Sequence, residues 1–347
     1  MNIETKETLV VSFSGGLTSG ELSVILKTQY SHIYNLVFIF SNTGCENEET
    51  LAFVNECDKA YNLNVVWVEA VVNPIHGKGI THRVTNFENA YRNHQYADPK
   101  HPFHAHIRKS GIPNANKPQC SDRLKALAIE HYKKVHGLQG CKHAIGMRAD
   151  EMNRAINKPV YNALKNVGLE PHAWRRIETS QQRLAALNEA VDKCLVAPVE
   201  KSLEKVYSYS QKLAQFNLVY PLIDWFPKTK QDINDAWEER DFTLDLEDHE
   251  GNCQTCWKKH KPKLYLLAAE HPERFEAFAY WEENYQHVKP NNDGQPRVFF
   301  RQHQSAKDIL AKSKELPLAQ LRMSVTKIKP KEDGSDGCSE SCESYAI

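Results

Sequence analysis

Short apolar runs and segments of helical spacing alternate along the first part of the chain. The runs at residues 9–13, 36–40 and 65–72 are rich in Val, Ile and Phe, which predicts buried strands. Residues 20–26 and 46–61 repeat apolar side chains at helical spacing, which predicts a helix after each of the first two strands. This alternation predicts an α/β fold with a parallel sheet and helices on both faces. Ligands of such sheets bind at the carboxyl ends of the strands.

Small and hydroxyl-bearing residues interrupt this pattern directly after the first strand. The segment SGGLTS occupies residues 14–19 and precedes the first predicted helix. Glycines let backbone N–H groups approach an oxyanion, hydroxyls add donors, and a helix N-terminus carries partial positive charge. We therefore expect an anion-binding loop here, and the turn at residues 41–44 ends the second strand at the same edge. An ordinary turn rich in Gly and Ser is the alternative.

Spacing excludes two common phosphate-binding loops at this position. Gly15 and Gly20 fit the start of a Walker loop, but Glu21 and Leu22 stand where Lys and Ser or Thr belong. The spacing of a dinucleotide-binding G-x-G-x-x-G loop is absent as well. The predicted anion site therefore belongs to neither of these two types.

The remainder of the chain predicts further helices and a helical insertion. A helix at 122–135 follows Cys120, where a helix N-terminus favours a thiolate, and residues 144–146 resemble another strand end. A charged patch at 147–154 comes next, for which a solvated helix start is the alternative. Two amphipathic helices, at 178–194 and 199–216, predict an inserted hairpin. The chain returns to the main domain at 220–225, and a capped helix is expected at 229–239.

These segments predict two regions. Residues 1–235 form the α/β domain that carries the predicted anion-binding loop, with a helical insertion at 157–218. Residues 236–347 form a mainly helical region that carries a C-x-x-C, at residues 253–256, and a cysteine-containing polar tail. Helices are expected at 263–269 and 273–283. Residues 73–118 are loop-rich, and we interpret their six histidines as solvated or substrate-facing rather than as metal ligands.

Composition and the lengths of the apolar runs indicate the cellular compartment of the protein. The 347 residues carry 44 basic and 44 acidic side chains, so the formal net charge of zero gives no global signal for nucleic acid or membrane. No apolar run approaches the roughly 20 residues of a membrane span, and the first residues do not resemble a signal peptide. These features predict a cytoplasmic protein without membrane contact. In a reducing compartment the nine cysteines favour metal, cluster or catalytic roles over a disulfide framework.

Seven motifs in order resemble one family. The chain is similar to the phosphoadenosine phosphosulfate (PAPS) reductase-like branch of the PP-loop ATP pyrophosphatases, also called adenine-nucleotide α-hydrolases, which implies a Rossmann-like fold of the HUP type. The resemblance covers nearly the whole chain except the insertion. Its motifs are FSGGLTSG at 13–20, SNTGCENEETLAFV at 41–54, QCSDRLK at 119–125, GMRADEMNR at 146–154, YPLIDW at 220–225, GNCQTCWKK at 251–259 and FFRQHQSAKDIL at 299–310.

The resemblance implies an adenine-nucleotide site at the sheet edge. Lys125 and Arg148 are suited to phosphate or sulfate charge that develops during the reaction. Asp150 or Glu151 could hold Mg²⁺, because hard cations take oxygen ligands. The implied nucleotide contacts are Ser14, Gly15, Gly16, Thr18 and Ser19 for the phosphates, Asn42, Thr43 and Gly44 beside the adenosine, and Gly146, Arg148 and Glu151 in the charged patch.

The resemblance also implies a cysteine-bound metal centre. Cys120, Cys253 and Cys256 are its candidate ligands, and Cys338 or Cys342 could supply a fourth. Four thiolates suit an iron–sulfur cluster or zinc; the resemblance favours a [4Fe–4S] cluster, with structural zinc as the alternative. Cys45 receives no role, because relatives often carry another residue there. The remaining cysteines, Cys57, Cys141 and Cys194, are interpreted as structural.

Two reactions and one non-enzymatic function remain open. In the first, ATP adenylylates an acceptor oxygen, pyrophosphate leaves, and sulfur then displaces AMP. In the second, a thiolate, with Cys342 as the catalytic candidate, attacks the sulfur of PAPS; the Cys-Gly-Leu-His ending of sulfonucleotide reductases is absent from this chain. In the third, the protein senses nucleotide within a defence or modification complex. The expected partners are ATP or PAPS, a sulfur donor or thiol reductant, and an unidentified acceptor, nucleic acid included; a homo-oligomer is compatible with the sequence.

Overall fold

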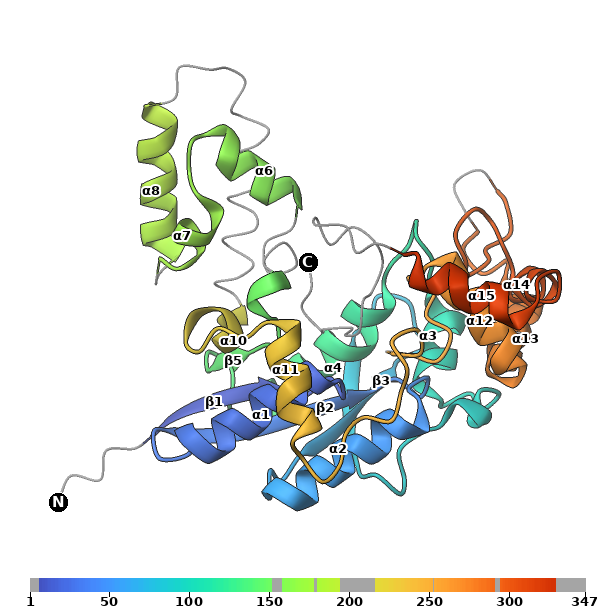
Figure 1. Ribbon diagram of the computed structural model, residues 1–347, viewed down its shortest axis with the longest axis horizontal. Coiled ribbons are helices and arrows are strands. Elements are labelled where there is room, and N and C mark those ends of the chain that lie inside the picture. Colours follow the sequence, from blue (N-terminus) through green and yellow to red (C-terminus); the bar gives the residue numbers. More distant parts are fainter. Residues whose placement is uncertain are drawn as a thin grey trace.

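A mostly parallel β-sheet forms the centre of the protein (Figure 1). The computed structural model describes residues 6–151, 158–177, 180–193, 216–251, 253–290 and 294–328. Within these residues the sheet has six strands in the order β4-β3-β2-β1-β5-β6. All neighbouring strands run parallel except β4, which is antiparallel to β3. The strands are β1 (Glu7–Ser12), β2 (Tyr34–Asn42), β3 (Val66–Val72), β4 (Ile80–Thr85), β5 (Lys142–Ala144) and β6 (Leu218–Val219).

Alternate residues of the central strands enter two different cores, because successive side chains of a strand point to opposite faces. Leu9 and Val11 of β1 face one core, whereas Val10 between them faces the other. The first core is closed by α1 (Leu17–Tyr30), α2 (Glu48–Tyr61) and α11 (Lys230–Glu238). The second is closed by α3 (Pro102–Ser110), α4 (Leu127–Val135), α12 (Lys261–Glu270), α13 (Glu276–Tyr285) and α14 (Ala306–Ser313).

The second core joins the two regions that the sequence suggests. Val10, Ile39 and Val68 of the sheet pack in one cluster with apolar side chains of α12, α13 and α14. The C-terminal helices therefore cover one face of the sheet, and α15 (Leu318–Thr326) packs against α12 on their outer side (Figure 1). This arrangement places the C-x-x-C segment next to the α/β domain, where Cys253 pairs with Glu46 in an isolated bridge.

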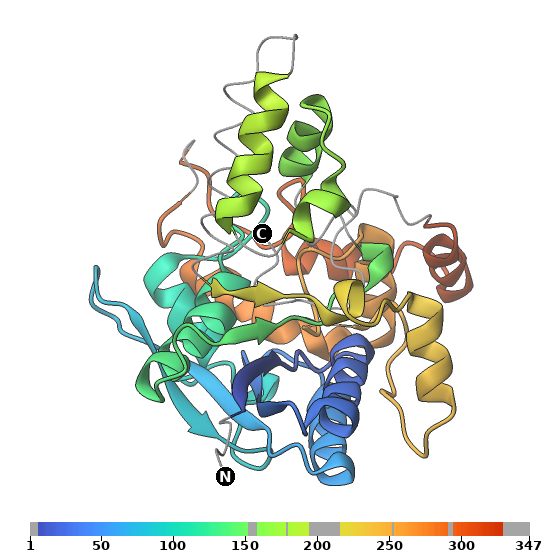
Figure 2. The same ribbon diagram turned by 90° about the vertical axis from the view of Figure 1, so that its left-hand side faces the viewer.

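Three helices of the insertion stand apart from the sheet. They are α6 (Lys158–Asn166), α7 (Pro171–Arg175) and α8 (Ser180–Asp192), and they project from one end of the molecule in both views (Figures 1 and 2). Their apolar side chains share a third core with Ile145, Met147, Tyr220 and Ile223. The helix α8 agrees with the expectation at 178–194. The second expected helix, at 199–216, lies outside the described residues apart from Phe216.

The segment 73–118 contains more regular structure than its sequence predicts. It includes the edge strand β4, the helix α3 and a single 3₁₀ turn, Asn93–Gln95. Of the two interpretations of its histidines, solvated or substrate-facing, the first is wrong for His101, His104 and His106, which are all buried. Packing of α3 between the sheet and α13 removes these rings from water. A 2.9 Å hydrogen bond between His104 Nε2 and the Tyr285 hydroxyl replaces a hydrogen bond to water that this ring loses.

Capping and several short helices complete the described structure. A capping box in which Thr229 and Asp232 bond each other's backbone begins α11, as the sequence predicts. Among the described residues, no helix combines the length and apolar character that crossing a membrane requires. The short helices are a π-helix (Ser121–Ala126) directly before α4, 3₁₀ turns at Ala149–Glu151 and Pro272–Phe275, and α10 (Pro221–Asp224).

Candidate functional site

The glycine loop, residues 14–19, follows β1 and leads directly into α1. Gly15 has a φ of +86°, and a Cβ at this position would lie 2.5 Å from Cγ2 of Thr50. Both the backbone conformation and the space therefore require glycine. Gly16 is the N-cap of α1 and, within the described structure, no side chain caps the helix there. The first N–H groups of the helix are thus available to an anion.

Hydroxyl groups fix the shape of the glycine loop. Ser19 Oγ accepts hydrogen bonds from Ser14 N, at 3.1 Å, and Ser14 Oγ, at 2.9 Å, and it donates to Gly16 O at 2.9 Å. The Ser19 side chain is buried, whereas Ser14 is half-buried. Ser19 therefore organises the loop internally, and the expected phosphate contact of its hydroxyl stays a prediction.

Arg148 connects the glycine loop to the segment after β5. Its Nη1 donates to Thr18 Oγ1 at 3.1 Å, and its Nε and Nη2 form ion pairs with Asp150 Oδ1, at 3.0 Å, and Glu151 Oε1, at 3.3 Å. Only 5% of Arg148 is exposed. The two carboxylates hold the guanidinium plane against the loop, so the cation is fixed in place before a ligand arrives.

Close packing brings the glycine loop and the segment after β5 together. A Cβ at Gly146 would lie 3.0 Å from Ser19 Cα, so this residue allows the two backbones to approach. A pocket lies beside Thr18 and Arg148, between the start of α1 and the residues around α11. It is lined by Leu17, Thr18, Arg148, Lys230, Ile233, Asn234, Leu244, Leu246, Glu247, Asp248 and Gly251. The structure thus brings together the predicted residues Thr18, Gly146, Arg148, Asp150 and Glu151.

The β2 turn, residues 43–47, uses its polar side chains internally. Asn42, at the end of β2, donates through Nδ2 to Glu69 Oε1 and to Tyr91 O, and its Oδ1 accepts from Gly44 N at 3.1 Å. Thr43 is buried, and both its N–H and its hydroxyl donate to Glu46. The predicted position of Asn42, Thr43 and Gly44 beside the adenosine stays a prediction.

Lys125 lies beside this turn in a buried ion pair. Its Nζ is 3.4 Å from Glu46 Oε1, and only 5% of Lys125 and 3% of Glu46 are exposed. The π-helix supplies Lys125 and also accepts a hydrogen bond from β2, from Ser41 Oγ to Leu124 O at 3.2 Å. Lys125 therefore joins the helix that follows Cys120 to the β2 turn.

Four cysteines lie around the β2 turn, and one of them was given no role from the sequence. Burial, and then the neighbouring Cys253, Glu46, Cys120 and Cys256, raise the pKa of the Cys45 thiol well above its ordinary value. The three predicted ligands in the described residues are therefore brought together, with Cys45 in addition. The signal that could have identified Cys45 is its position, because it directly follows a strand end at the ligand-binding edge.

The structure contains no preformed site for a single metal ion in the part of the chain that it describes. No group of three or more His, Cys, Asp or Glu side chains there could hold one. The predicted ligand Cys338 and the predicted nucleophile Cys342 lie outside the described residues. What the described cysteines offer is a set of neighbouring thiols, the donor chemistry that an iron–sulfur cluster requires.

A Rossmann-like sheet with a glycine- and hydroxyl-rich loop after β1 defines a nucleotide-binding α/β protein of the PP-loop class. Comparison of the sequence with family models supports this class, because the phosphoadenosine phosphosulfate reductase domain matches residues 8–235. The chain belongs to this family, which lies in the PP-loop adenine-nucleotide α-hydrolase superfamily and binds adenine nucleotides. The resemblance inferred from the motifs is confirmed.

A phage protein resembles nearly the whole chain. The uncharacterized nin region protein ORF290 of Escherichia phage lambda is 25% identical over 338 residues, which cover 97% of this chain and 94% of the phage protein. No solved structure matches the chain significantly. The similarity to the phage protein extends through the C-terminal region, beyond the residues that the family model matches.

Proposed function

We propose that the protein is an enzyme that activates an acceptor with ATP and then transfers sulfur to it. The observation that carries this proposal is the glycine loop with Arg148 fixed against Thr18. An anion-binding loop and a buried, oriented guanidinium are suited to hold the pyrophosphate part of ATP and to stabilise charge that develops as it leaves. Membership of a largely enzymatic family supports the general assignment.

The proposed reaction has two displacements. An oxygen of the acceptor attacks the α-phosphorus of ATP, the bond from that phosphorus to the bridging oxygen breaks, and pyrophosphate leaves with the electron pair. Hydrosulfide, or a donor at the same oxidation level, then attacks the acceptor carbon, the carbon–oxygen bond breaks, and AMP leaves. No external oxidant or reductant is needed when the sulfur arrives at this level.

Several residues have roles in this proposal. The N–H groups at the start of α1 and Arg148 bind phosphate oxygens. Asp150, whose side chain is 40% exposed, is better placed to take Mg²⁺ than Glu151, whose side chain is 6% exposed. Cys120, Cys253 and Cys256 would hold an iron–sulfur cluster, which when bound supplies a site for the sulfur that is transferred.

Binding measurements test the nucleotide site directly. We expect calorimetry to show ATP binding that Arg148→Lys weakens roughly 10- to 100-fold, because the lysine cannot reproduce the oriented guanidinium contacts. Arg175→Lys is the matched control, since Arg175 is also buried and paired, with Asp224 at 2.6 Å, but lies in the insertion. Equal ATP affinity in Arg148→Lys and the wild type would contradict the assignment.

Product analysis distinguishes the reactions. The protein is incubated with ATP and candidate acceptors, and separately with PAPS and a thiol reductant. AMP and pyrophosphate from ATP support the proposal. Sulfite from PAPS that disappears in Cys342→Ser, without pyrophosphate from ATP, would establish the reductase reaction instead. Nucleotide binding with neither product would favour a nucleotide-sensing protein.

A further inference from the structure

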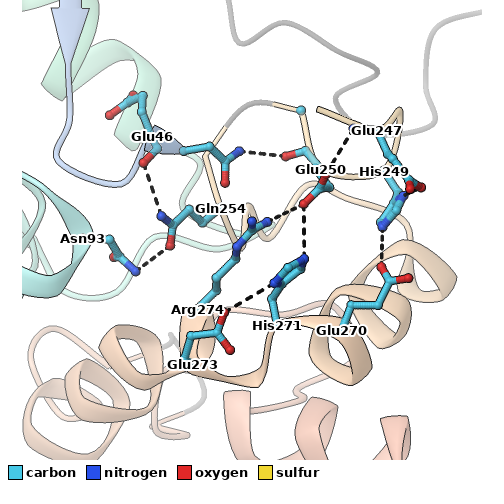
Figure 3. Close-up of polar contacts among 12 residues, drawn as sticks. Glu46, Asn93, Glu247, His249, Glu250, Gln254, Glu270, His271, Glu273 and Arg274 are labelled. Atoms are coloured by element: carbon cyan, nitrogen blue, oxygen red, sulfur yellow. Dashed lines mark hydrogen bonds and ion pairs between the residues drawn. The ribbon is translucent and has the colours of Figure 1, made fainter. Parts of the chain in front are cut away.

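Cys45 lies in the β2 turn, directly against the C-x-x-C segment. Gln254 N donates to Cys45 O at 2.9 Å, and Glu46 pairs with Cys253 in an antiparallel bridge. The Gln254 side chain accepts from Asn93 Nδ2 at 2.8 Å and donates to Glu46 O at 3.4 Å (Figure 3). The C-x-x-C segment is therefore fixed to the backbone of Cys45 and Glu46.

A second layer of contacts holds this segment in place. Glu250 O accepts from Asn47 Nδ2 at 3.1 Å, and the Glu250 carboxylate pairs with Arg274 at 2.7 Å (Figure 3). The start of α2 is thus connected through Glu250 to the helices of the second core. These contacts involve Glu250 and Gln254, which flank Cys253 along the chain. The fold therefore fixes the position of the C-x-x-C segment relative to Cys45.

The four cysteines come from three separate segments of the chain. Cys253 Sγ lies 3.9 Å from Thr43 Oγ1 in the β2 turn, and Cys256 N donates to Cys253 O at 3.3 Å. Cys120 is the N-cap of the π-helix, which the Lys125–Glu46 pair anchors beside the same turn. Cys45 is completely buried, whereas Cys120 and Cys253 are half-buried and pack against its core. Cys45 therefore lies at the inner side of the group.

Chemistry decides what such a group can bind. Thiolate sulfurs that lie close to one another need a cation to compensate their charge, and binding of such a cation releases the thiol protons. A single zinc ion held by these four cysteines would need all four sulfurs at about 2.3 Å from one centre, and no group suited to one metal ion exists among the described residues. In a [4Fe–4S] cluster each thiolate binds a different iron, so its ligands stand further apart than those of one ion.

We infer that Cys45 is the fourth thiolate ligand of a [4Fe–4S] cluster, together with Cys120, Cys253 and Cys256. The inference rests on the proposed function only in that this function includes a cluster. It assigns no ligand role to Cys338 or Cys342. Cys45 thereby places the cluster directly at the end of β2, on the ligand-binding edge of the sheet.

Iron content and the paramagnetic resonance spectrum test this ligand set. Wild-type protein, reconstituted anaerobically with ferrous iron and sulfide, should bind about four iron atoms per chain. Cys45→Ser should retain about three or fewer, with an altered spectrum after reduction, because one iron loses its thiolate. Cys57→Ser is the matched control, since Cys57 is equally buried but packs in the other core, and it should match the wild type.

Further variants make the test independent of folding. The double variant Cys338→Ser with Cys342→Ser should also retain about four iron atoms and an unchanged spectrum. Thermal unfolding of the metal-free proteins compares Cys45→Ser with Cys57→Ser and shows whether the substitution itself disrupts the core. Loss of iron in the double variant, or full iron and an unchanged spectrum in Cys45→Ser, would overturn the inference. Uptake of stoichiometric zinc instead of iron by the wild-type protein would overturn it as well. ATP calorimetry on the same samples tests the nucleotide site separately.

Discussion

The glycine loop and the cysteine group lie at the same edge of one sheet but are assembled differently. The loop is local, since Ser14 to Ser19 shape one another through hydrogen bonds within six residues. The cysteine group, Cys45, Cys120, Cys253 and Cys256, requires segments more than 200 residues apart to meet. The loop can therefore form wherever β1 and α1 form, whereas the cysteine group depends on the complete fold.

The largest expected effect concerns the buried Lys125–Glu46 ion pair, which lies beside the cysteine group. Lys125→Met removes the partner of the buried Glu46 carboxylate and should lower the free energy of unfolding by about 3–5 kcal/mol. Combining it with Glu46→Gln should recover much of this loss, because no unpaired charge is left. Lys142→Met is the control: its pair with Glu7 is largely exposed and should cost less than about 1 kcal/mol. Denaturant unfolding measures all four proteins; equal losses in Lys125→Met and Lys142→Met would contradict the buried pair.

A smaller effect is expected at the glycine loop. Gly15→Ala and Gly77→Ala both place a side chain at a positive φ, of +86° and +81°, but only the first brings its Cβ within 4 Å of other atoms. Gly15→Ala should therefore destabilise the protein by about 1–3 kcal/mol more than Gly77→Ala, because of its contact with Thr50. Chemical denaturation gives the difference, and ATP calorimetry should show weaker binding for Gly15→Ala alone. If the two variants are equally stable, the loop is not packed against α2 as described.

The smallest expected effect is a dependence of stability on pH that arises from His101, which contacts the β2 turn. Burial lowers the pKa of His101 from its ordinary 6.5 to about 4, and the ring contacts Gly44 O at 3.2 Å. The unfolded chain therefore binds a proton that the folded protein does not. Stability from this group is present above pH 6.5 and is lost as the pH falls toward 4. His101→Phe should reduce the slope of stability against pH in this window by at most about 1.4 kcal/mol per pH unit. Unfolding at several pH values measures the slope, and parallel curves for the two proteins would show that His101 does not titrate this way.

The nucleotide-binding type of fold could be predicted from the sequence because its signals are local. The apolar runs specify β1, β2 and β3, and Gly15 and Gly16 interrupt the pattern where the loop must turn. The segment 73–118 was less predictable. The strand β4 alternates polar and apolar residues weakly at the sheet edge, and α3 carries histidines whose burial depends on contacts with α13.

The sequence by itself therefore determined the first three strands, the helices that follow the first two of them, the glycine loop and the family. Hydrophobic periodicity and turn chemistry act between near neighbours, so they can be read along the chain. Only the tertiary structure decided that Arg148 is held against Thr18, that the Asn42 side chain is used within the protein, and that Cys45 joins the other thiols. These contacts depend on how the sheet edge, the π-helix and the C-terminal helices pack, and no spacing within a single segment encodes that packing.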